Sequence, residues 1–153
     1  MSTDFITRSL SVALASGVLL TVMPYPSHAD RRSGLDDLSK EMSTCSAYFS
    51  LLAEIVGNAE GPPTKAEVAG RIKSTGQAML MQAINVANYI GVADDEVMQR
   101  AKKAMDEMVA TINADPPNSL AIMHTRYGVP CDELLENAPR RFAELIARGR
   151  EDF

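Results

Sequence analysis

The two cysteines of this sequence have the widest range of possible chemistry. Cys45 and Cys131 could act as nucleophiles, bind a metal or form a disulfide. Cys131 follows Pro130 at an expected helix start, where the helix dipole favours a thiolate. However, the chain has no Cys-x-x-Cys pair, and two cysteines in an exported protein most simply bond to each other. The sequence therefore predicts a Cys45–Cys131 disulfide.

Methionine offers a second possible chemistry, because thioether sulfur is a good ligand for Cu(I) in oxidising compartments. The methionines beyond residue 30 are Met42, Met79, Met81, Met98, Met105, Met108 and Met123. Several fall on expected inner faces of helices, where methionine ordinarily fills the core. One histidine and two paired cysteines also cannot supply a zinc site. We therefore predict no metal site and no cofactor, and keep a periplasmic Cu(I)-binding protein as the alternative function.

A run of hydrogen-bonding side chains at 124–127 is the third candidate. We expect Tyr127 to pack its ring inward and to satisfy its hydroxyl locally, while His124 and Arg126 face solvent. A deep polar cleft around His124 and Tyr127 would instead favour an enzyme. Without such a cleft, this run does not form a catalytic set.

Paired carboxylates occur at two places, Asp36 with Asp37 and Asp94 with Asp95. Both pairs are expected at helix starts, where capping explains acidic residues without any acid–base catalysis. The sequence also lacks a glycine-rich phosphate loop, and no motif in it identifies a family. We therefore predict no catalytic residues and a protein that is not an enzyme.

Apolar residues at spacings of three and four predict that helices carry these side chains. The expected helices cover 35–57, 64–90 after a Thr-x-x-Glu capping box, 95–113, 119–127 and the segment from 130 onward. Gly91 should end the second helix in the left-handed conformation, and a tight antiparallel hairpin should join it to the third. Asp94 should cap the third helix, Gly128 should end the fourth, and Pro139 should divide the last. The prediction is an all-α fold, an irregular bundle of four or five helices stapled by one disulfide.

The same spacing predicts which side chains form the core. The inner face of the first helix is expected to contain Leu35, Leu38, Met42, Cys45, Phe49, Leu52 and Val56. The inner face of the second is expected to contain Val68, Ile72, either Thr75 or Gly76, Met79, Ala83, Val86 and Ile90. The last segment should contribute Leu134, Leu135, Phe142, Leu145 and Ile146.

Residues 1–29 have the pattern of a secretory signal peptide. Arg8 lies in a short basic region, which is followed by an apolar run at 10–20 and by a Ser-His-Ala motif. We expect cleavage before Asp30. The remaining residues, 30–153, would form a single helical domain in a bacterial periplasm or secreted from the cell.

An uncleaved membrane anchor that runs to Tyr25 is the alternative for the N-terminal region. The apolar run is short for a bilayer span and is broken by prolines. We therefore expect no stable membrane insertion after the signal is removed.

Overall composition limits the class of partner. The chain has 153 residues, of which 46% are hydrophobic and 23% charged, as in an ordinary single-domain globular protein. A net charge of −5 and the absence of tryptophan give no basis for nucleic-acid binding. We expect an exported helical protein of the cell envelope that binds an unknown envelope protein or a small apolar ligand.

Overall fold

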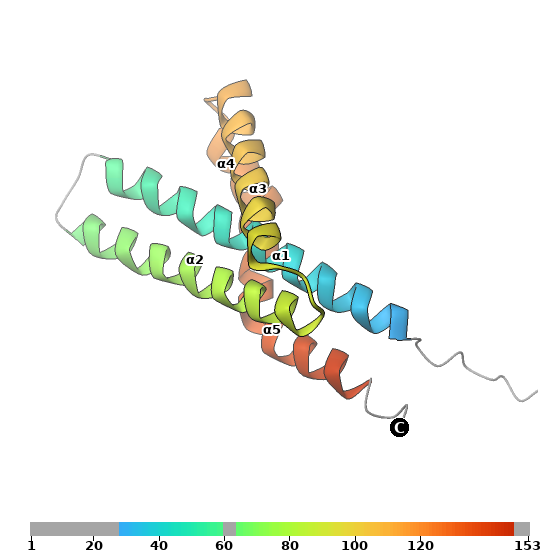
Figure 1. Ribbon diagram of the computed structural model, residues 1–153. Helices are drawn as coiled ribbons and strands as arrows, with labels where there is room; N and C mark the ends of the chain where they lie inside the picture. The colour runs from blue at the N-terminus through green and yellow to red at the C-terminus, as the bar shows by residue number, and fades with distance from the viewer. Residues whose placement is uncertain (1–27, 60–63, 149–153) are drawn as a thin grey trace, which may run out of the picture.

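Figure 1 presents a computed structural model of the chain, which describes residues 28–59 and 64–148. The elements are α1 (His28–Asn58), α2 (Thr64–Tyr89), α3 (Asp94–Ala114), α4 (Ser119–Met123), the π-helical segment η1 (His124–Gly128) and α5 (Val129–Ala147). Every element in these ranges is helical, so the predicted all-α bundle is confirmed. Residues 1–27 of the expected signal peptide lie outside the described residues, and its cleavage stays a prediction.

The first helix is longer than the sequence pattern indicated. It begins at His28 rather than near residue 35, and Asp30 lies in its first turn, where the helix dipole favours a negative charge. The expected inner face is largely confirmed, because the buried side chains of α1 include Leu35, Leu38, Met42, Cys45 and Phe49.

Helices α1 and α2 lie side by side and antiparallel (Figure 1). Small residues form their interface. The buried Ser39 hydroxyl donates to the carbonyl oxygen of Ala83 at 3.0 Å, which links the two backbones directly. A Cβ atom on Gly76 would lie 3.1 Å from the carbonyl oxygen of Ser46. A larger residue at position 76 would therefore require the facing residues of α1 to shift by a few tenths of an ångström.

Gly91 ends the second helix as predicted. Its φ is 76°, in the left-handed region that favours glycine. The Val92 N–H donates to the carbonyl of Ala87 at 2.9 Å, and the Gly91 N–H donates to Asn88 at 3.1 Å. This is the Schellman pattern, which satisfies carbonyl groups at a helix end.

The direction of α3 differs from the prediction. Figure 1 shows α3 rising steeply away from α2, and it packs chiefly on α1, so the expected antiparallel hairpin of the second and third helices is wrong. Its buried residues, Val97, Ala104 and Met108, cover α1 because α1 already occupies the inner face of α2. Ala93 is the N-cap residue, which places Asp94 inside the first turn rather than at the cap.

The predicted breaks at Gly128 and Pro139 are also wrong. Gly128 has helical angles, φ −60° and ψ −56°, and the chain continues from α4 through η1 into α5 without a stop. Pro139 lies inside α5 on its exposed side. A proline removes the N–H that would bond to the carbonyl of Leu135, and on an exposed face water can replace that donor.

The core is built around α1, which contacts α2, α3 and α5. Three expected core residues, Val56, Val68 and Leu135, are not part of it. Val68 is 47% exposed and Leu135 is 40% exposed, because each lies at the edge of its helix's inner face. Helix α1 therefore positions α2, α3 and α5.

Candidate functional site

The Cys45–Cys131 disulfide joins α1 to the first turn of α5. The two Cα atoms are 5.3 Å apart, and the side chains are 4% and 1% exposed. The predicted pairing is confirmed. With both sulfur atoms bonded and buried, neither is available as a nucleophile or a metal ligand in this state.

The methionines are mainly core residues. Those buried in the core are Met42, Met79, Met108 and Met123. Met98 is half exposed, and Met105 is partly buried at the core edge. Met98 and Met105 are two turns apart on α3, about 10 Å along its axis. Both sulfur atoms could therefore bind one ion only if the two side chains extended toward each other along the helix. The copper alternative stays a prediction that this placement does not favour.

The polar run at 124–127 coincides with the π-helical turn. Tyr127 packs inward and is 8% exposed, whereas His124 and Arg126 face solvent, as predicted. The Arg126 guanidinium lies 5.3 Å from the centre of the Tyr127 ring. The expected local partner for the Tyr127 hydroxyl is not found among the described residues. That part of the prediction is wrong.

Gly128 allows two polar groups to approach the π-helical turn. A Cβ atom at this position would lie 2.8 Å from both His124 Nδ1 and the Tyr48 hydroxyl oxygen. Burial raises the pKa of Tyr48, and the negative charge of Asp132 raises it further. Because the Tyr48 phenol therefore stays protonated at neutral pH, it is a hydrogen-bond donor and a poor general base.

A hollow beside the disulfide is lined by this segment and by α1, with a volume of about 280 Å³. Two of its charged residues are already paired, Lys40 with Asp36 at 2.6 Å and Glu41 with Arg141. The hollow is lined mainly by apolar surface. The deep polar cleft that would have favoured an enzyme is not formed by these described residues, although the absence of activity stays a prediction.

The acidic pair of α1 has a different role from the one expected. Because α1 begins at His28, Asp36 and Asp37 lie well inside it, so the capping interpretation is wrong. Asp36 Oδ1 is 2.9 Å from Arg100 Nη1 on α3. Burial works to raise the pKa of Asp36, but hydrogen bonds and charge from Lys40 and Arg100 outweigh it and lower the pKa below 3.8. This ion pair fixes α3 on α1.

A second ion pair fixes α5. The two terminal nitrogens of Arg141 on α5, Nη1 and Nη2, donate hydrogen bonds to the Glu41 carboxylate of α1, with Nη2 3.0 Å from Oε1. The hydrogen bond to Glu41 raises the pKa of Arg141, and burial opposes it. Such a bidentate pair both attracts α5 to α1 and fixes its orientation on α1.

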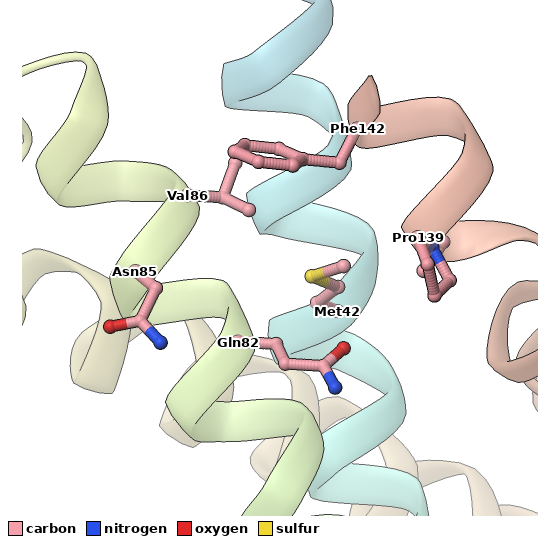
Figure 2. A pocket seen from close by; sticks show the side chains of 7 residues that line it. Met42, Gln82, Asn85, Val86, Pro139 and Phe142 are labelled. Atoms are coloured by element: carbon pink, nitrogen blue, oxygen red, sulfur yellow. The ribbon is translucent and has the colours of Figure 1, made fainter. Parts of the chain in front are cut away.

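The α2–α5 groove is an apolar hollow between these two helices, with α1 beneath it (Figure 2). Met42 of α1 and Val86 of α2 are buried side chains that line it. Ala138, Pro139 and Phe142 of α5 form the facing wall. Helices α2 and α5 both pack on α1 but have little packing against each other, which leaves the groove open.

Two carboxamides complete the lining. Gln82 and Asn85 lie one turn apart on α2, and Figure 2 shows Gln82 extending from α2 across toward Met42. Neither side chain has a hydrogen-bond partner among the described residues. None of the described residues that line the groove is charged. It therefore offers apolar surface together with two free, uncharged hydrogen-bonding groups.

The groove suits one bulky apolar group. Its volume is about 220 Å³. Sites for drug-sized molecules have about 300–1,000 Å³, whereas a cavity of about 150 Å³ lined by apolar side chains binds benzene. At one end, Tyr89 and Phe142 contact each other edge to face with ring centres 6.2 Å apart. An aromatic ring or a branched aliphatic chain would fill this space.

Sequence analysis did not identify this groove. The sequence pattern predicted a helix break at Pro139 and indicated no role for Gln82 or Asn85. The residues come from three helices that are distant in sequence, so no local spacing could have grouped them.

Within 28–59 and 64–148, no three His, Cys, Asp or Glu side chains are grouped so that they could hold a metal ion. None of the helices in the described part of the chain has the length and apolar character needed to cross a membrane. Comparisons with protein-family models, curated proteins and solved structures gave no match.

Proposed function

We propose that this protein is a binding module that takes one apolar group of a ligand or partner in the α2–α5 groove. The observation that supports this most strongly is the lining itself, in which buried apolar side chains meet two carboxamides that have no internal partner. Binding sites typically combine an apolar surface with a few placed polar groups in this way.

Binding is favoured over catalysis because the groove has no titratable side chain. Elsewhere, the pairs Asp36 with Arg100 and Glu41 with Arg141 hold helices together and are not free for proton transfer. A protein with this distribution of polar groups can recognise an apolar group but lacks an evident general acid or base beside it.

Toluene is a suitable probe for this proposal because it is a single uncharged ring. We expect toluene to bind the purified protein in isothermal titration, with a dissociation constant in the millimolar range or below. Gln82→Trp adds bulk at the groove and should weaken binding at least tenfold. Gln77→Trp is the matched control, because Gln77 is exposed on α2 and lines a different hollow.

The proposal is contradicted if toluene shows no binding up to its solubility limit. It is also contradicted if Gln82→Trp and Gln77→Trp retain equal affinity, because the probe would then be bound elsewhere.

We also propose that the protein works outside the cytoplasm, in the periplasm or secreted. The disulfide supports this, because structural disulfides persist in oxidising compartments. N-terminal sequencing of protein recovered from the producing cells should begin at Asp30. A form that retains residues 10–20 would indicate a membrane anchor instead.

A further inference from the structure

The polar groups of the α2–α5 groove indicate what the apolar group is attached to. Gln82 and Asn85 each offer a carbonyl acceptor and an N–H donor, and both are exposed and unpaired within the described residues. A pure hydrocarbon would leave these groups unused. A carboxamide pairs well with another amide, because each supplies the donor and the acceptor that the other needs.

Charge argues against an ionised occupant. No lysine, arginine or carboxylate lines the groove, and an ionised headgroup such as a fatty-acid carboxylate is ordinarily bound by a cation or by several N–H donors. The groove is therefore suited to a neutral polar group beside the apolar one.

Spacing and size fit a peptide. Gln82 and Asn85 are three residues apart, which is a rise of about 4.5 Å along α2. An extended chain advances about 3.3 Å per residue, and each residue carries one N–H and one carbonyl. The two carboxamides can thus reach the backbone groups next to a single seated residue. The groove volume of about 220 Å³ suits one large side chain and not a whole ligand of drug size.

The apolar surface also continues beyond the groove. Tyr89 contacts Phe142 at one end and is 55% exposed, so a neighbouring residue of a longer occupant would find an aromatic ring to pack against.

We infer that the occupant is an extended polypeptide segment, seated with one bulky apolar side chain in the α2–α5 groove and hydrogen-bonded through its backbone to Gln82 and Asn85. This inference rests on the proposed function. It adds the class of partner and two residues that select it.

The test compares N-acetyl-L-phenylalanine N-methylamide with toluene, because the capped amino acid adds backbone amides to the same kind of ring. We expect the capped amino acid to bind the wild-type protein about tenfold more tightly, from two net hydrogen bonds. The double variant Gln82→Ala, Asn85→Ala should bring the ratio of the two affinities close to one, whatever its effect on toluene binding itself. Asn88→Ala is the control, because Asn88 is an exposed carboxamide on α2 that does not line the groove.

Each other outcome overturns the inference in a recognisable way. If toluene binds and the capped amino acid binds no better, the groove takes a free apolar molecule, and the proposed function stands alone. If the advantage survives in the double variant, the carboxamides do not read the backbone. If the capped amino acid dissociates a dimer in analytical ultracentrifugation, the occupant is a second copy of this chain. If neither probe binds, the proposed function fails as well.

Discussion

Helix α2 and helix α5 both pack on α1, but they are held there by different means. The α1–α2 interface is made by small residues in close contact, with the Ser39 hydroxyl bonded to the Ala83 carbonyl. Helix α5 also packs apolar residues on the core, with Leu145 close to Gly34 of α1, and it is further joined to α1 by the Cys45–Cys131 disulfide and by the ion pair of Arg141 with Glu41.

The α2–α5 groove exists because both helices pack on α1 while making little contact with each other. The α2–α5 groove lies where α5 meets α1 without packing closely on α2. The disulfide and the Glu41–Arg141 ion pair help to hold α5 in this position on α1.

Removal of the disulfide should have the largest effect on this arrangement. The bond closes a loop with a sequence separation of 86 residues, for which the chain-entropy model gives about 4–5 kcal/mol of stabilisation. A Cys45→Ser, Cys131→Ser variant should therefore melt many degrees lower when followed by circular dichroism. Amide hydrogen exchange should show α5 opening before α1 and α2.

Wild-type protein under reducing conditions is the matched control and should melt close to the double variant. An unchanged melting temperature would reject the disulfide as the main attachment of α5. Faster exchange in α1 and α2 than in α5 would reverse the comparison between the two helices.

Two glycines of α2 test the close packing on α1. A Cβ atom on Gly76 would meet the Ser46 carbonyl oxygen at 3.1 Å and the Phe49 Cβ at 3.2 Å, whereas Gly70 has no neighbour within 4 Å. Gly76→Ala should lower the free energy of unfolding by about 1–2 kcal/mol through overpacking. Gly70→Ala should raise it by about 0.5–1 kcal/mol through helix propensity. Urea denaturation measures both, and equal stabilisation by the two substitutions would show that the interface is not tight.

The Asp36–Arg100 ion pair should have a smaller effect, which depends on pH. Asp36→Asn should cost about 1 kcal/mol at neutral pH. Because the folded protein lowers the pKa of Asp36 below 3.8, this stabilisation is present above the unfolded pKa and is lost as pH falls through the folded pKa. The stability gap between wild type and variant should narrow as the pH falls below about 4.

Asp37→Asn serves as the control for this pair, because the Asp37 side chain is 59% exposed and its ion-pair partner is Lys40. Its expected effect on the free energy of unfolding is below about 0.5 kcal/mol. A gap for Asp36→Asn that is constant over this pH range would mean that the ion pair does not hold α3.

Much of the fold could be predicted because it depends on local patterns. The burial of Leu35, Leu38 and Met42 follows from their helical spacing, and Gly91 follows from the left-handed conformation at a helix end. The disulfide followed from there being only two cysteines, both in positions that face inward. These features need no knowledge of how the helices cross.

The rest depends on tertiary contacts. The short connection after Gly91 permits a hairpin, but the buried face of α3 packs on α1 and sets its direction. Gly128 and Pro139 are usual helix breakers, yet the helix continues through both. The Tyr48 hydroxyl lies close to Gly128, where a larger residue would clash with it, and Pro139 lies on an exposed face of α5. The groove residues Gln82 and Asn85 carry no periodic signal at all.

Intermolecular nuclear Overhauser effects from bound toluene test the central claim most directly. With methyl-labelled protein, the account predicts contacts from the toluene ring protons to the methyl groups of Met42 and Val86, which line the α2–α5 groove. Ala53 and Ala69 line a separate hollow between α1 and α2 and should show none. Contacts to Ala53 and Ala69 without contacts to Met42 and Val86 would contradict the account, since the apolar group would then lie outside the groove.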